Sequence, residues 1–188
     1  VVLTLLVLPE IQPVAAGEWP THLLGLQIYS ASGPLEGLSQ TWSLCTEISF
    51  YVLLPVLGLI AVGRRRRTPE QAWRRQLWFL GVLFAASWVW TVYRFVAVDA
   101  VPYQVHYWLP GFLDWFAVGM FLALVQVRST LDRPPRLVRV LRELAHDQGT
   151  ALVLAVAVFV VACTPIAGAY KFVPNTPWQS LIKHLLYA

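Results

Sequence analysis

Apolar residues along this chain form long blocks that are separated by short polar segments. The blocks cover about 43–62, 78–98, 109–127 and 150–169. Each is close to the ~20 residues that an α-helix needs to cross the hydrocarbon core of a bilayer. Residues 1–8 have the pattern of the end of another membrane helix, and a further one begins near Trp178. The pattern predicts an all-α, polytopic transmembrane helical bundle with about five to six membrane segments.

Two other segments carry weaker patterns. Residues 9–41 form a long loop with three glutamates and no Lys or Arg, and 21–30 are predicted to be a short helix at the membrane interface. Residues 135–148 alternate basic and apolar positions at helical spacing, which predicts a basic amphipathic helix on the membrane surface. Its apolar residues are predicted to face the lipid; these are Leu137, Val138, Leu141, Leu144 and Ala145.

The composition supports a membrane protein rather than a soluble domain. Hydrophobic residues make up 57% of the chain, charged residues 13%, and the mean hydropathy is +0.60. The net charge of +4 does not indicate a nucleic-acid partner, because the basic residues are concentrated in two loops. Cys45 and Cys163 both fall in apolar runs and are predicted to be small core residues, although a disulfide between them stays open. No metal-ligand spacing is present, so no metal or bound cofactor is predicted.

The basic residues also predict the orientation in the membrane. The segments 64–75 and 128–142 hold 6 and 5 arginines, which is 11 of the 14 Lys and Arg residues. By the positive-inside rule the loops Arg64–Arg67 and Arg128–Arg142 are cytoplasmic, and residues 9–41 lie outside. The use of 12 Arg against 2 Lys is typical of a GC-rich bacterial genome. The predicted location is therefore a bacterial cytoplasmic membrane, crossed several times.

Three ionisable residues lie inside the predicted spans: Glu47, Arg94 and Asp114. Each is four or five residues from the predicted outer end of its helix, so the three share one depth, about 6–8 Å below the surface. Charges at this depth usually face the interior of the protein or a water-filled cavity. They are predicted to approach one another, either as a functional site or as a structural ion pair that holds the helices together.

The surroundings of Glu47 favour a functional role. By the three-and-four spacing of a helix, five residues are predicted to lie on one side: Ser43, Glu47, Phe50, Tyr51 and Leu54. Pro55 has no N–H, so the carbonyl of Tyr51 loses its helical partner. Trp42 is predicted to lie at the water interface, where tryptophan is enriched. A carboxylate, a phenol and a carbonyl without a helical partner thus gather within about two turns.

This stretch resembles the signature of the acyltransferase 3 family, integral membrane proteins that move acyl groups from acyl-CoA onto sugars. The family pattern reads roughly Trp-Ser-Leu, Glu, Phe-Tyr and Pro at set distances. Residues 112–119 are also similar to a later helix of the family, in which an Asp precedes a Gly by five. The residues that match the signature in place are Trp42, Ser43, Leu44, Glu47, Phe50, Tyr51 and Pro55.

The resemblance implies an acyltransferase whose acceptor is a hydroxyl of a sugar, a cell-envelope glycan or a glycolipid. Acyl-CoA is then a co-substrate, and acetyl is one possible acyl group. The family's catalytic histidine belongs to its first helix, which would precede Val1. Residues 1–188 are thus expected to be part of one membrane-embedded acyltransferase domain, truncated at both ends and inactive alone. Glu47 would support catalysis together with Arg94 and Asp114, and the predicted substrate-binding residues are Trp42, Ser43, Tyr51 and His184.

Several alternatives stay open at this point. The cluster Arg64, Arg65, Arg66 and Arg67 is predicted to bind the phosphates of the donor, although a role in orienting the chain is enough to explain it. His106 and His184 lie near the outer side, and either could accept a proton. Buried charges and a proline kink would also suit a proton-coupled transporter or flippase. A structural membrane subunit without chemistry is the third possibility.

Overall fold

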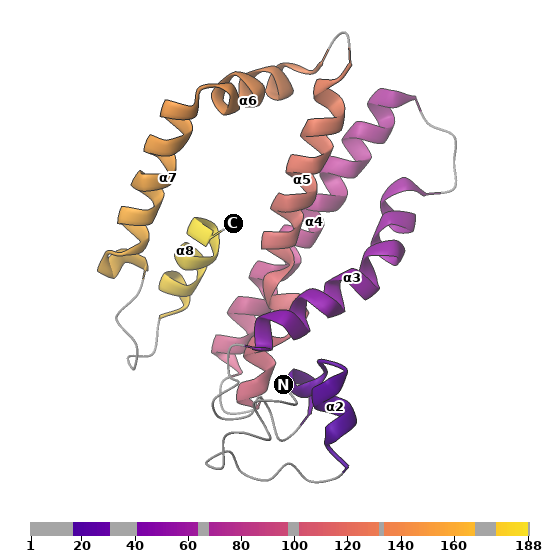
Figure 1. Cartoon of the computed structure of the whole chain (residues 1–188), viewed down its shortest axis with the longest axis vertical. Helices are drawn as coiled ribbons and strands as arrows, with labels where there is room; N and C mark the ends of the chain where they lie inside the picture. Colours follow the sequence, from indigo (N-terminus) through magenta and orange to yellow (C-terminus); the bar gives the residue numbers. More distant parts are fainter. Residues whose placement is uncertain are drawn as a thin grey trace. The chain divides into compact units, whose positions relative to one another are not determined.

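The computed structural model describes residues 17–30, 41–63, 68–97, 102–131, 134–167 and 176–187. Every regular element within these ranges is a helix (Figure 1). The chain divides into two compact units, one made of residues 1–72 and 93–112 and the other of residues 73–92 and 113–188. Helix α4 contributes to both units. The predicted helix over residues 1–8 and the cluster Arg64–Arg67 lie outside the described residues.

The first unit is built around helix α3, Thr41–Val62. This confirms the predicted second helix, and its 22 residues are apolar enough to cross a membrane. Pro55 lies inside the helix, and the ribbon of α3 changes direction along its length (Figure 1). The missing N–H and the ring of a proline account for such a bend.

Short 3₁₀ helices pack against α3 in this unit. They are η1, Gln27–Tyr29; η2, Tyr103–Tyr107; and η3, Leu109–Phe112. Helix α2, Trp19–Leu23, precedes them in the chain. The prediction of one helix over 21–30 is therefore correct only in part. Gly25 interrupts it with a φ of 68°, a left-handed conformation that favours glycine. An added Cβ there would also lie 3.0 Å from Cδ1 of Ile48 on α3.

Polar and aromatic contacts hold these segments to α3 and to one another. Thr46 donates its hydroxyl hydrogen to the carbonyl of Tyr107 at 2.9 Å. The Trp42 ring lies 5.2 Å from each of the rings of Tyr107 and Phe112. The indole N–H of Trp108 donates to the carbonyl of Ile28 at 2.9 Å. Trp42, which was predicted to bind substrate, thus packs within this aromatic cluster.

Helix α4, Pro69–Val96, begins earlier than the apolar pattern predicted. Thr68 caps it: its side chain accepts from the Gln71 amide at 3.3 Å, and the Gln71 side chain accepts from the Thr68 amide at 3.2 Å. This reciprocal pair is a capping box. The helix therefore starts at its cap and includes Arg74 and Arg75, whereas the sequence pattern placed those arginines in a loop.

The second unit contains the central part of α4 and the remaining helices. Ser87 bonds Asp114 at one end of α5, and Trp73 packs with Val125 nearer its other end, so the two helices run antiparallel. The helices that follow α4 are α5, Leu113–Ser129; α6, Arg136–His146; α7, Gln148–Ala162; the short η4, Pro165–Ala167; and α8, Pro177–Tyr187.

Three helical stretches in the described residues are long and apolar enough to cross a membrane: Thr41–Val62, Pro69–Val96 and Leu109–Ser129. A fourth crossing requires α6 and α7 to be counted together, although they meet at 90°. Helix α7 ends at Ala162, well before the predicted residue 169, because Pro165 cannot continue the helical hydrogen bonding. The structure therefore supports three to four spans, and the predicted total of five to six is not shown.

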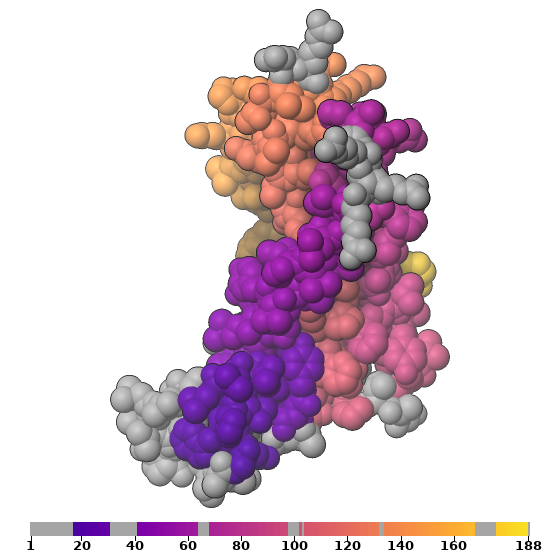
Figure 2. Space-filling model, turned by 90° about the vertical axis from the view of Figure 1, so that its right-hand side faces the viewer, coloured from indigo at the N-terminus to yellow at the C-terminus, as the bar shows by residue number. Residues whose placement is uncertain are grey.

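Helix α6 follows the end of α5, and its side chains occupy one end of the second unit (Figure 2). Its helical and amphipathic character confirms the pattern over 135–148. The prediction that its apolar face lies against lipid is wrong for Val138, which is 0% exposed and packs with Trp73 and Val125. Leu141 packs against the same cluster. An apolar stripe on a helix can be covered by protein as well as by lipid.

The two cysteines differ in burial. Both are free thiols; Cys45 is buried and Cys163 is exposed. The Cys45 thiol donates to the carbonyl of Thr41 at 3.0 Å. The prediction of a core residue is therefore confirmed for Cys45 and wrong for Cys163, which follows the last residue of α7. Helix α7 has no buried residue, and most of its apolar side chains are exposed.

Candidate functional site

A buried carboxylate, Asp114, lies at the centre of the second unit's polar contacts. It is 0% exposed and is the second residue of α5. A carboxylate in the first turn of a helix is stabilised by the unpaired amides and the positive end of the helix dipole. The amide of Trp115 donates to Oδ1 of Asp114 at 3.0 Å. The start of α5 therefore supplies one backbone hydrogen bond to the buried Asp114 side chain.

Two side chains from other helices complete the surroundings of Asp114. The Ser87 hydroxyl, on α4, donates to Oδ1 at 2.9 Å. Nδ1 of His184, on α8, lies 3.1 Å from Oδ2. The three groups come from helices that are distant in sequence, and Ser87 is also fully buried. A buried charge is tolerated when its oxygens are paired in this way.

The pairing orients the His184 ring. When the Asp114 carboxyl is ionised it can only accept hydrogen bonds, and the neutral His184 ring then carries its hydrogen on Nδ1 and its lone pair on Nε2. The His184 side chain is 12% exposed, so it is mostly but not completely covered. A histidine whose Nδ1 is held by a carboxylate is the arrangement that general acid–base catalysis uses.

Trp115 contacts both the backbone and the ring of His184. Its indole N–H donates to the carbonyl of His184 at 3.2 Å, and the two ring centroids are 5.6 Å apart. The same indole lies 5.9 Å from the ring of Tyr187, one turn further along α8. Adjacent residues of α5 thus bind the side chain and the backbone of His184. This double attachment fixes α8 against the start of α5.

No family model, curated protein or solved structure matches this chain. The similarity of residues 42–55 to the acyltransferase 3 signature therefore stays a prediction. The arrangement of Asp114, Ser87, Trp115 and His184 is the observation on which a functional proposal can rest.

The residues of the predicted acyltransferase signature lie on α3, which belongs to the first unit. The side chains of Ser43, Glu47 and Tyr51 are all exposed on α3, as expected for positions on one helical face. Cys45, Thr46, Phe50 and Leu57 form the buried side of the same helix. The predicted common face is therefore correct for Ser43, Glu47 and Tyr51 and wrong for Phe50, which is buried, and a role for this face in binding substrate stays a prediction.

Arg94 belongs to the first unit and is buried near the end of α4. It is 7% exposed and donates from one terminal nitrogen to the carbonyl of His106 at 3.3 Å. Its Nε has no hydrogen-bond partner within the described residues. Glu47 and Arg94 are in one unit and Asp114 is in the other, so a site shared by all three stays a prediction.

Sequence reasoning identified Asp114 and His184 separately but did not pair them. It missed Ser87 and Trp115, because a serine or a tryptophan in an apolar helix is unremarkable by itself. One available signal was the spacing of Ser87, Thr91 and Arg94, which places three polar residues on one face of α4. All three are buried, and the Thr91 hydroxyl has no hydrogen-bond partner among the described residues.

Proposed function

We propose that this chain is part of a membrane-embedded acyltransferase that moves an acyl group from acyl-CoA to a hydroxyl of a sugar, a cell-envelope glycan or a glycolipid. The observation that carries the proposal is the contact of 3.1 Å between Nδ1 of His184 and the buried carboxylate of Asp114. It supplies a positioned proton acceptor within a helical chain apolar enough to lie in a membrane. The signature over residues 42–55 supports the acyl-transfer reaction in particular.

In the proposed reaction, Nε2 of His184 takes the proton of the acceptor hydroxyl. The hydroxyl oxygen attacks the thioester carbonyl, and the resulting intermediate expels the CoA sulfur. His184 returns the proton to that sulfur, so an ester and free CoA are formed without an external oxidant or reductant. Asp114 stabilises the imidazolium that exists between the two transfers, and Ser87 and Trp115 keep Asp114 in place.

The remaining predicted roles belong to the same proposal. Glu47 supports catalysis, Ser43 and Tyr51 bind the acceptor, and the cluster Arg64–Arg67 binds the donor phosphates from the cytoplasm. The arginine-rich loops then face the cytoplasm of a bacterium and residues 9–41 face outward. The exposure of Ser43, Glu47 and Tyr51 on α3 supports the proposed roles of these three residues, because it leaves them accessible to a substrate or to another helix.

The test compares His184→Gln and Asp114→Asn in membranes containing the protein as its gene encodes it. Membranes receive acetyl-CoA, release of CoA is followed with a thiol reagent, and acetyl esters on envelope glycans are measured by mass spectrometry. His184→Gln should lower transfer by about 10²–10⁴-fold, the usual contribution of a positioned proton acceptor. Asp114→Asn should lower it by at least about tenfold, because it removes the charge that stabilises the imidazolium.

His146→Gln is the matched control, because His146 is exposed on α6 and should leave transfer unchanged. Membrane abundance of each variant is measured alongside. Full transfer by His184→Gln at normal abundance would overturn the role of the Asp114–His184 pair.

A proton-coupled transporter is the second candidate, since the same pair could bind and release a proton during transport. Such a protein would leave acetyl-CoA intact. In proteoliposomes it would instead carry protons, and Asp114→Asn would reduce that flux.

A further inference from the structure

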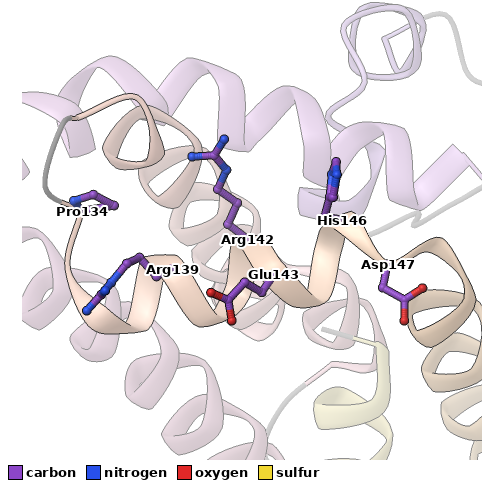
Figure 3. A pocket seen from close by; sticks show the side chains of 6 residues that line it. All are labelled: Pro134, Arg139, Arg142, Glu143, His146 and Asp147. Atoms are coloured by element: carbon purple, nitrogen blue, oxygen red, sulfur yellow. The ribbon is translucent and has the colours of Figure 1, made fainter.

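Helices α6 and α7 form an elbow of 90° at Asp147, and two cavities open beside it. The first has a volume of about 540 Å³ and is lined by charged residues of α6 together with Asp147 (Figure 3). The second, of about 450 Å³, is mainly apolar and lies among α5, α6 and α7, with Leu122, Leu144 and Leu154 in its lining. Both volumes are in the range of small-molecule sites. Arg142 lines both cavities.

The charged cavity contains groups of both signs. Arg139 and Arg142 supply two guanidinium groups, and Glu143 and Asp147 supply two carboxylates. In the view of Figure 3, Arg142 and His146 extend upward from α6, whereas Arg139 and Glu143, and Asp147 just after the helix, extend downward. A ligand that carries only negative charge would meet the carboxylates, and one that carries only positive charge would meet the guanidinium groups. The lining therefore fits a headgroup that carries both charges.

Two hydrogen bonds hold the Asp147 side chain in place at this elbow. Its carboxylate caps α7 by accepting from the Gly149 amide at 3.2 Å, and it also accepts from the Thr150 hydroxyl. The hydrogen bond from Thr150, helped by the amide, holds the pKa of the Asp147 carboxyl below its ordinary value. The group is therefore ionised at neutral pH. Two carboxylate oxygens offer about four lone-pair sites, so they can accept further hydrogen bonds from a ligand.

We propose that the elbow binds one membrane phospholipid whose headgroup carries a phosphate and a primary ammonium, that is, a phosphatidylethanolamine. In such a lipid the phosphate lies between the ammonium and the acyl chains. Arg142, which lines both cavities, binds the phosphate, Glu143 and Asp147 accept from the ammonium, and one acyl chain occupies the apolar cavity. Helix α7 has no buried residue, so lipid can reach the elbow from the membrane.

The same chemistry argues against the other common headgroups. A choline headgroup has no N–H to donate to the carboxylates of Glu143 and Asp147. A phosphatidylglycerol headgroup has no cation, so its phosphate could meet Arg142 but it would offer no ammonium to Glu143 and Asp147. Selectivity for the ammonium headgroup over both competitors is therefore the specific consequence of the proposal.

The test uses the purified, delipidated protein in detergent with an equimolar mixture of phosphatidylethanolamine, phosphatidylcholine and phosphatidylglycerol that carry identical acyl chains. Native mass spectrometry counts the lipid retained. We expect phosphatidylethanolamine to be retained at least about threefold more than each competitor. A ratio of this size corresponds to roughly one additional ion pair at an exposed site. The double variant Glu143→Gln, Asp147→Asn should lose this preference, and asparagine can still cap α7. Arg142→Gln should weaken the retention of all three lipids.

Arg136→Gln is the matched control: it removes one guanidinium from the same helix, at an exposed residue that is not part of either lining. It should retain the wild-type preference. Circular dichroism establishes that each variant keeps its helix content. Equal retention of the three lipids by the wild-type protein, a preference for phosphatidylglycerol, or an unchanged preference in the double variant would each overturn the proposal.

Discussion

Replacing Val138 by alanine is expected to weaken the packing of α6 in the second unit. Val138 is 0% exposed and lies in a cluster with Trp73 and Val125, against which Leu77 and Leu141 also pack. The substitution removes two buried carbon groups, each worth about 0.8 kcal/mol. The cavity that remains adds a further term, because the neighbouring side chains relax only partly. The expected loss is about 2 kcal/mol in the free energy of unfolding.

The matched control is Val140→Ala on the same helix, where the valine is 45% exposed. Both variants gain the same intrinsic helix propensity, since alanine is the better helix former in each case. The difference between them therefore isolates the burial of Val138. Unfolding is measured by circular dichroism during a denaturant titration of the purified protein in mixed micelles. If Val138→Ala and Val140→Ala unfold at the same denaturant concentration, the cluster does not hold α6, and the apolar face lies against lipid after all.

Two further predictions concern the first unit and the orientation of the chain. Glu47→Gln should keep normal membrane abundance, because Glu47 is exposed on α3. It should lower acetyl transfer at least about tenfold if the Glu47 charge supports the reaction. Full transfer by this variant would show that Glu47 is only a polar residue at the membrane interface. The orientation is tested by single-cysteine labelling after Cys45 and Cys163 have been replaced by alanine. A cysteine in place of Glu36 should react with an impermeant thiol reagent from outside, whereas one in place of Glu70 should react only after the membrane is opened. Reaction of both cysteines from outside would contradict the predicted orientation.

Much of the local structure could be predicted from the sequence. Helix α3 matches its predicted bounds to within two residues, and α6 is the amphipathic helix that its basic and apolar pattern indicates. The errors lie at helix ends. The hydroxyl of Thr68 starts α4 before the apolar block begins, and Pro165 prevents α7 from continuing to residue 169. A hydropathy pattern reports where a helix is apolar, whereas capping groups and proline decide where its backbone hydrogen bonding begins and ends.

The sequence by itself determined that Asp114 needs a partner, because an ionised carboxylate in an apolar helix is costly unless it is paired. Only the tertiary structure decided that the partner is His184, 70 residues away, with Ser87 and Trp115 on the same carboxylate. It also decided that Val138 faces protein. The physical reason is the same for both. Helical periodicity fixes which side chains share a face, but the group that covers that face is chosen by the packing of helices that are distant in sequence.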